Sequence, residues 1–178
     1  MIRALLLMVV LWGVSLPTTA HATGHDVVVV DLLYGTTIAS FGGDTKWQPS
    51  LWLDGSYGVV GPLHLGAYFQ WLGSEFGLKD PGFGGGAFVA LRKNINKARL
   101  SAAFGGGGLG VPVPREAPET GFRKEKSGSI TALVGIGFGF LDFMGFELRG
   151  RWARYFKMPP GTPDNAWSLE AGFSVFIR

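Results

Sequence analysis

Large apolar residues alternate with small or polar residues at the end of the chain. In the stretch 166–177, Trp167, Leu169 and Phe173 share one phase, while Glu170 lies on the other. A period of two is typical of a β-strand with two different faces. An unpaired terminal strand exposes backbone hydrogen-bonding groups, so we expect this strand to pair with another part of the chain.

The same alternation, bounded by turn residues, recurs along the sequence and predicts eight strands. The predicted segments are 26–39, 50–60, 63–73, 83–93, 98–109, 128–140, 146–157 and 166–177. Helix signals are absent, and the 29 glycines disfavour helices because glycine has a low helix propensity. The sequence therefore predicts an all-β protein.

Long and short connections alternate between the predicted strands. The short ones are Gly61-Pro62, Asn94–Asn96 and Leu141–Gly145, and the long ones are Phe41–Pro49, Ser74–Gly82, Val111–Ser127 and Met158–Asn165. This rhythm is typical of an up-and-down meander with turns at one rim and loops at the other. Both ends then lie on the short-turn rim, where the last strand can pair with residues 27–30 of the first. We expect an eight-stranded antiparallel up-and-down transmembrane β-barrel.

The two phases of the strands differ in chemistry. The phase predicted to face outward holds Leu51, Leu53, Leu63, Leu65, Phe69, Leu100, Phe104, Ile130, Val134, Ile136, Phe138, Phe140, Phe146, Leu148, Leu169, Phe173, Val175 and Ile177. The phase predicted to face inward holds charged, polar and glycine residues, among them Ser56, His64, Gly66, Gln70, Ser101, Gly135, Gly137, Gly139 and Gly172. Small residues suit the narrow interior of an eight-stranded barrel, and glycine suits a water-facing surface poorly. The pattern favours lipid outside over a soluble lipocalin-like carrier, which stays the alternative.

Aromatic residues on the outward phase lie near the predicted strand ends. They are Tyr57, Trp71, Trp152, Phe156 and Trp167. Aromatic side chains at this position form the girdles that meet lipid headgroups.

The first residues resemble a cleaved signal peptide. Arg3 precedes a short apolar run, 4–16, and Ala20-His21-Ala22 has the small-x-small pattern of a cleavage site. The run is too short to span a bilayer as a helix. We expect residues 1–22 to be removed and 23–178 to form one exported barrel domain. A net charge of +3, spread along the chain, gives no reason to expect a nucleic-acid partner.

With this leader, eight alternating segments and this loop rhythm, the chain resembles the small outer-membrane barrels of the OmpA and OmpX kind. The resemblance is architectural and covers residues 23–178. It implies location in a Gram-negative-type outer membrane, contact with membrane lipid, assembly by the outer-membrane assembly machinery, and a monomer. Such proteins usually end on an aromatic residue, whereas here Phe176 is followed by Ile177 and Arg178.

Charged residues on the inward phase are the most specific candidate site. They are Asp31, Asp54, Arg99, Glu147, Arg149, Arg151 and Glu170. In so narrow a lumen, opposed charges can pair and fill the interior as a structural plug. The other interpretation is a polar pathway or ligand site.

Other motifs give little support to catalysis or cofactor binding. Gly105-x-Gly107-x-x-Gly110 formally fits a dinucleotide fingerprint, but Val111-Pro112 follows where a helix is required. The chain has no cysteine, and only His25 and His64 follow the leader. We therefore expect no metal, no cofactor and no enzymatic activity.

The longest predicted loop carries many charges. Its cations Arg115, Arg123, Lys124 and Lys126 are candidates for contact with lipopolysaccharide or a partner. Three functions remain: a structural or surface-interaction barrel with a plugged lumen, a narrow passage or pocket for small molecules, apolar ones included, and the soluble carrier.

Overall fold

The computed structural model describes residues 27–41, 44–73, 82–114, 122–156 and 164–177. The described residues form eight strands: β1 (Val28–Phe41), β2 (Asp44–Val60), β3 (Leu63–Leu72), β4 (Gly82–Ile95), β5 (Ala98–Pro114), β6 (Phe122–Leu141), β7 (Met144–Phe156) and β8 (Asn165–Ile177). The strands close into a barrel in sequence order, and every neighbouring pair is antiparallel. The predicted fold class and the number of strands are confirmed.

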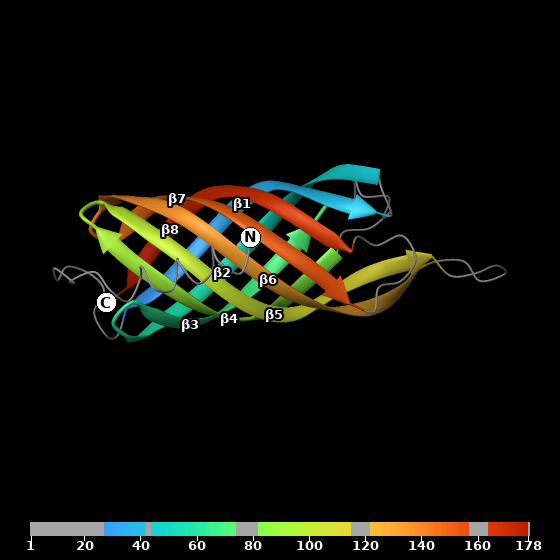
Figure 1. The fold of residues 1–178 in the computed structure, drawn as a ribbon, viewed down its shortest axis with the longest axis horizontal. Coiled ribbons are helices and arrows are strands. Elements are labelled where there is room, and N and C mark those ends of the chain that lie inside the picture. Colours follow the sequence, from blue (N-terminus) through green and yellow to red (C-terminus); the bar gives the residue numbers. More distant parts are fainter. Residues whose placement is uncertain (1–26, 42–43, 74–81, 115–121, 157–163, 178) are drawn as a thin grey trace, which may run out of the picture.

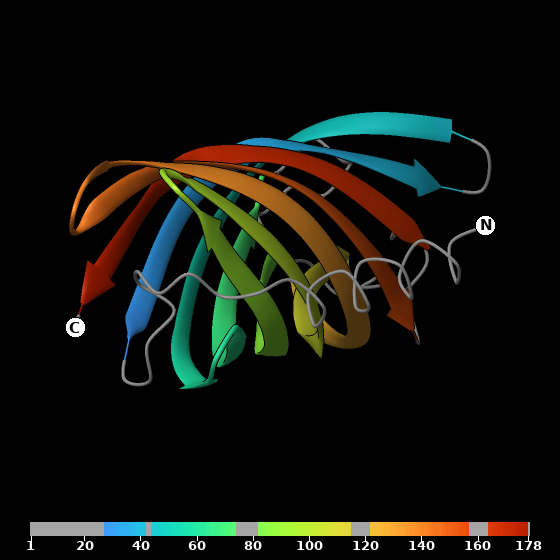
Figure 2. The ribbon, with the colours of Figure 1, turned by 60° about the vertical axis from the view of Figure 1, so that its left-hand side comes forward.

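Closure comes from the pairing of the last strand with the first. The register runs from Val28 opposite Ile177 to Ser40 opposite Asn165. The strands cross the long axis of the barrel obliquely (Figure 1), and a second view shows the curvature of the sheet (Figure 2). The terminal strand therefore has a partner on each side, as its alternation led us to expect.

Tight turns join the strands at one rim. Gly61-Pro62, Asn96-Lys97 and Asp142-Phe143 form these turns, and Gly61 (φ 51°) and Asn96 (φ 56°) adopt the left-handed conformation. Glycine and asparagine tolerate that conformation better than other residues. The turn expected at Asn94–Asn96 lies slightly later, because β4 pairs with β5 up to Ile95 opposite Ala98.

Two hairpins are longer than the sequence predicted. The expected loop Phe41–Pro49 is wrong, since β1 and β2 stay paired up to Phe41 opposite Asp44. The expected loop Val111–Ser127 is also too long, because β5 and β6 stay paired up to Pro114 opposite Phe122. The β5–β6 hairpin reaches beyond its neighbours at the long-loop end (Figure 1). Polar residues and prolines in these stretches resemble loop sequences, whereas pairing with the preceding strand keeps them extended.

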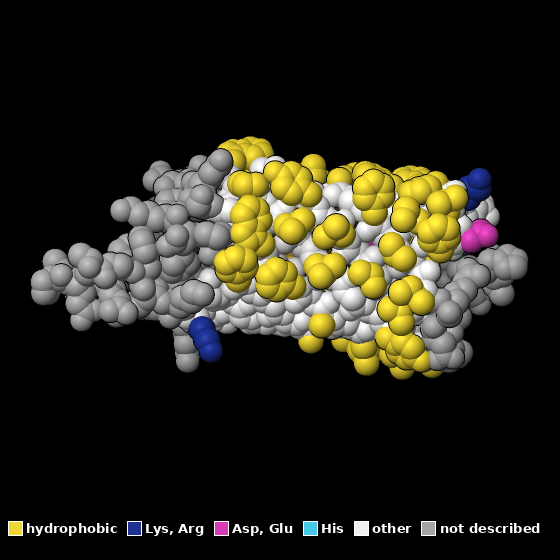
Figure 3. Space-filling view, turned by 180° about the vertical axis from the view of Figure 1, so that it is seen from behind, with side chains coloured by type: hydrophobic (Ala, Val, Ile, Leu, Met, Phe, Trp, Pro, Cys, Tyr) yellow, Lys and Arg dark blue, Asp and Glu magenta, His cyan; other side chains and the backbone are white. Residues whose placement is uncertain are grey.

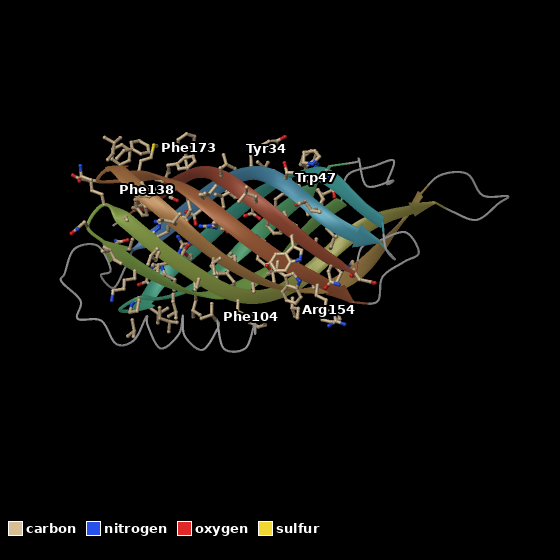
Figure 4. All side chains as sticks on the ribbon, turned by 45° about the horizontal axis from the view of Figure 1, so that its top comes forward. Tyr34, Trp47, Phe104, Phe138, Arg154 and Phe173 are labelled. Carbon is tan, nitrogen blue, oxygen red and sulfur yellow. The ribbon has the colours of Figure 1, made fainter. Side chains whose placement is uncertain are left out.

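The outer surface is apolar. Exposed large side chains include Leu53, Leu65, Phe69, Val89, Phe104, Val134, Phe138, Leu148, Leu169 and Phe173. Figure 3 shows one side of the barrel, with hydrophobic side chains over its middle and the visible charged side chains at its two ends. In Figure 4, Tyr34, Trp47, Phe104, Phe138 and Phe173 point away from the interior. The exposed phase of the strands therefore carries most of the large apolar side chains.

Candidate functional site: the charged lumen

Eight charged side chains meet inside the barrel. They are the arginines Arg92, Arg99, Arg149 and Arg151 and the carboxylates Asp31, Asp54, Glu147 and Glu170, each no more than 6% exposed. They come from β1, β2, β4, β5, β7 and β8 because each lies on the inward phase of its strand. Four positive and four negative charges leave the cluster, which we call the lumen network, formally neutral.

Arg149 lies at the centre of the lumen network. Its Nη2 donates a hydrogen bond to Asp31 and its Nη1 donates to Asp54. Its Nε donates to Glu147 Oε1 at 2.8 Å. One guanidinium thus joins carboxylates from three strands. Such charge-assisted contacts are the strongest hydrogen bonds that side chains form.

Asp31 forms ion pairs with two arginines from the opposite side of the lumen. Arg92 Nη2 lies 2.8 Å from Asp31 Oδ2, and Arg99 Nη2 lies 3.7 Å from Asp31 Oδ1. These arginines belong to β4 and β5, which do not pair with β1 in the sheet. The ion pairs therefore span the interior and connect opposite walls of the barrel.

Glu147 is held by two hydroxyl groups and by a second cation in addition to Arg149. Arg99 Nη2 donates to Glu147 Oε2, Ser101 Oγ donates to Oε1 at 3.0 Å, and Ser174 Oγ lies 3.1 Å from Oε2. Arg99 also donates to Ser174 Oγ at 2.7 Å. A buried carboxylate is tolerated only when such partners satisfy it.

Arg151 and Glu170 form a second centre. Arg151 Nε donates to Glu170 Oε1 at 2.9 Å, and Arg151 Nη2 lies 3.2 Å from both Glu170 Oε2 and Asp54 Oδ2. Ser168 Oγ donates to Glu170 Oε1 at 2.5 Å. The guanidinium carbon of Arg151 lies 3.7 Å from the centroid of the Trp52 ring, in cation–π geometry.

Apolar side chains fill the lumen beside these charges. Leu33, Trp52, Tyr68, Phe88 and Ala90 form a buried cluster on β1 to β4. The rings of Trp52 and Tyr68 lie 5.7 Å apart between centroids. Because Trp52 also stacks on Arg151, the apolar cluster and the lumen network form one continuous packed layer.

Glycines provide the space that this layer needs. A Cβ atom placed on Gly135 would lie 2.7 Å from Ser101 Oγ and 2.8 Å from Arg149 Cγ. A Cβ on Gly137 would lie 3.2 Å from Glu147 Oε2 and 3.4 Å from Arg99 Nε. Both glycines are on β6, whose inward face therefore receives the long side chains of β5 and β7.

All seven predicted lumen charges lie in the lumen network. The structure adds Arg92, which sequence reasoning missed, and pairs Glu170 with Arg151, although Arg149 is its partner in the strand register. The role of these residues stays a prediction. Trp52, Tyr68 and Phe88 were missed as lumen residues, because large aromatic residues are ordinarily expected on the lipid face.

The predicted girdle residues lie on the outer face. Trp71, Trp152, Phe156 and Trp167 are near the long-loop end, and Tyr57 is near the short turns. The rings of Trp152 and Trp167 lie 6.4 Å apart between centroids. Trp47, 62% exposed near the same end, was missed because its segment was assigned to a loop. Their role at a membrane interface stays a prediction.

The predicted outer-loop cations are only partly described. Arg115 lies outside the described residues, Arg123 and Lys124 belong to β6, and Lys126 is exposed on β6. The predicted signal peptide, residues 1–22, also lies outside the described residues. Within the part of the chain that the structure describes, no helix is long and apolar enough to cross a membrane.

A small cavity lies at the short-turn mouth of the barrel. It measures about 300 Å³ and is lined by Val27, Asn96, Lys97, Arg99 and Phe176, among others. The guanidinium carbon of Arg99 lies 4.5 Å from the centroid of the Phe176 ring. Arg99 therefore belongs both to the lumen network and to the lining of this cavity.

No protein-family model matches the sequence, and no curated protein matches it significantly. Solved structures do match its fold, which is that of small eight-stranded outer-membrane β-barrels. Neisserial surface protein A (NspA) has a TM-score of 0.63 and 12% identity, covering 84% of this chain and 95% of NspA.

Two further solved barrels share the fold. The N-terminal β-barrel domain of Pseudomonas aeruginosa OprF has a TM-score of 0.60 and 10% identity, covering 86% of this chain and 99% of that domain. Ail, the attachment invasion locus protein of Yersinia pestis, has a TM-score of 0.54 and 13% identity, covering 85% and 99%. At such identities the likeness concerns the fold alone.

Proposed function

We propose that this chain is a barrel of a Gram-negative-type outer membrane that acts as a structural or surface-interaction protein and not as a channel. The observation that carries the proposal is the lumen network, in which four arginines and four carboxylates are buried and paired across the interior. An open aqueous channel would leave such side chains exposed to water. The apolar outer face and the shared fold with outer-membrane barrels support the membrane location.

The location is tested by fractionation. The protein should remain in the outer-membrane fraction after carbonate extraction, and its migration on gels should change on heating. Release into the soluble periplasm would favour the soluble carrier and contradict the proposal.

The closed lumen is tested by conductance. The refolded protein, inserted into planar bilayers, should give no steady single-channel current, because the side chains of the lumen network are each no more than 6% exposed. Insertion must be verified independently by the heat-dependent gel shift. A steady current from correctly inserted protein would overturn the plug and favour a passage.

A surface role predicts which segments reach the outside. The long-loop end, with the exposed Lys126, would face the exterior and contact lipopolysaccharide or a partner. In intact cells, a cysteine label should therefore react with Lys126→Cys but not with Asn96→Cys. The reverse labelling would mean that the barrel is inserted in the opposite sense.

A binding pocket for small molecules is the second candidate, favoured by the cavity at the short-turn mouth. Its volume of about 300 Å³ is at the lower limit of typical ligand sites. A Cβ on Gly139 would have Lys97 O, at 3.8 Å, as its nearest neighbour, so a larger side chain there would project into free space. Gly139→Leu should abolish binding of any ligand that uses the cavity, while leaving the gel shift unchanged.

A further inference from the structure

Among the strand residues whose side chains the structure describes, the charged residues on the outer face are few and of one sign. The outward phase of these described residues holds Lys93, Lys126 and Arg154, and no carboxylate. Lys93 lies near the short turns, whereas Lys126 and Arg154 lie at the long-loop end of neighbouring strands. The balance of charge found in the lumen therefore does not extend to the outside.

Lys126 and Arg154 lie on either side of an exposed glycine, Gly128. The register places Gly128 opposite Phe156 and Ile130 opposite Arg154, and Lys126 precedes Gly128 by two positions on the same face. A Cβ built on Gly128 would have no heavy atom within 4 Å. Neighbours on one face of a strand and diagonal neighbours on adjacent strands are each about 7 Å apart, so both cationic side chains can reach the space over Gly128.

The aromatic residues around Gly128 indicate the depth of a lipid headgroup. The Trp152–Trp167 pair lies next to Arg154 on the outer face, one step closer to the middle of the barrel. The guanidinium carbon of Arg154 lies 6.0 Å from the Phe156 ring centroid. Aromatic belts mark the boundary between the apolar core of a bilayer and its headgroups. In Figure 4, Arg154 points away from the barrel, toward the space that lipid would occupy.

We propose that Lys126 and Arg154 bind the phosphate group of an anionic lipid over Gly128. The inference rests on the membrane location proposed above. The cations have no carboxylate on the described outer face, and a phosphate offers several acceptors to a guanidinium and an ammonium group at once. Glycine leaves the room that the phosphate needs, and the aromatic rings contact the adjoining part of the lipid.

The test compares two lipids that differ only in the phosphate. Native mass spectrometry of the folded protein in detergent would measure the binding of dioleoyl phosphatidic acid and of dioleoylglycerol. The wild type should bind phosphatidic acid about tenfold more tightly or better, since a single charge-assisted contact is worth about one factor of ten. In Lys126→Ala/Arg154→Ala the two lipids should bind equally.

Two further variants separate the site from its net charge. Gly128→Trp keeps both cations but occupies the open space over Gly128, and it should also lose the preference for phosphatidic acid. Lys97→Ala removes an exposed cation from a turn at the short-turn end of the barrel, and this variant should keep the preference for phosphatidic acid. A preference that survives the double substitution, or one lost in Lys97→Ala, would overturn the site.

The same measurement distinguishes a lipid site from a general anion site. Inorganic phosphate at millimolar concentration should not displace phosphatidic acid. The aromatic residues contact the part of the lipid that adjoins the phosphate, and inorganic phosphate has no such part, so it should bind more weakly. Displacement would overturn the assignment to lipid. The heat-dependent gel shift and insertion into vesicles are recorded for every variant. If the wild type fails to insert, the membrane location itself is wrong; if it inserts and shows no preference, only the phosphate site is wrong.

Discussion

Arg149 and Arg154 lie on the same strand, β7, but on opposite faces of the barrel wall. Arg149 is 1% exposed and contacts three carboxylates, whereas Arg154 is exposed and has no ion-pair partner among the described residues. The lumen supplies a counter-charge for each of its arginines from the chain itself. The described outer face supplies none. The alternation of the two faces thus separates a buried arginine that is paired within the chain from an exposed arginine that has no ion-pair partner among the described residues.

The inner side of this comparison is tested most severely at Arg149. Arg149→Ala would leave Asp31, Asp54 and Glu147 without their shared cation, and we expect a loss of about 3–5 kcal/mol in the free energy of unfolding. Urea titration of the protein folded in micelles would measure it. Arg149→Lys, which keeps the charge but not the three-way geometry, should lose less. If Arg149→Ala costs under about 1 kcal/mol, the interior is hydrated and the network is not a plug.

The outer side is tested at Leu169, which is 64% exposed on β8. Leu169→Arg should cost about 2–4 kcal/mol of folding into vesicles, because it places a charge in the apolar core of the bilayer. Asn165→Arg, at the end of the same strand and on the same phase, should cost about 0–1 kcal/mol. Equal costs at the two depths would argue against lipid contact on this face.

The pairing within the lumen predicts a specific coupling. Glu170→Ala and Arg151→Ala should each destabilise the protein, and the double variant should lose less than the sum by about 0.5–3 kcal/mol. A double-mutant cycle of Glu170→Ala with Arg149→Ala should give a smaller coupling free energy. The two residues are opposite each other in the strand register, but the structure shows an ion pair of Glu170 with Arg151 and none with Arg149. A larger coupling free energy with Arg149 would mean that Glu170 pairs with Arg149, its neighbour in the strand register, and not with Arg151.

The smallest effects are expected at two glycines on opposite faces. Gly137→Ala should cost on the order of 1 kcal/mol, because its Cβ would lie 3.2 Å from Glu147 Oε2. Gly150→Ala, whose Cβ would have no atom within 4 Å, should stabilise the protein by about 0.5–1 kcal/mol. Thermal loss of the folded gel band would rank both against the wild type. Stabilisation by Gly137→Ala as well would show that space in the lumen is not limiting.

The fold was largely predictable because alternation is strong where one face is bulky and the other charged. On β7, Phe146 and Leu148 alternate with Glu147 and Arg149, and both phases were predicted. The ends of the long hairpins were not predictable, since their pairing depends on the opposite strand and not on local hydrophobicity. Hence Asp44 begins β2 within a segment that resembles a loop.

Most residues of the lumen network were predicted from the sequence, but their pairing was not. Arg92 was missed because β4 is apolar on both faces, with Phe88 and Ala90 inside and Val89 outside. The sequence of this strand therefore does not show which residues point inward. The choice of Arg151 for Glu170 follows from side-chain packing, in which Trp52 supports the guanidinium. Neither fact is encoded in the spacing of the charges.

The most direct test of the account is the reactivity of single cysteines toward a charged, water-soluble thiol reagent. The native chain has no cysteine, so each introduced thiol reports alone. In vesicles, Ser174→Cys in the lumen and Leu169→Cys on the outer face should both resist the reagent, while Asp164→Cys at the exposed long-loop end should react rapidly. Reaction of Ser174→Cys as fast as Asp164→Cys would reveal water in the lumen, and the same rate at Leu169→Cys would show that the outer face is not in lipid.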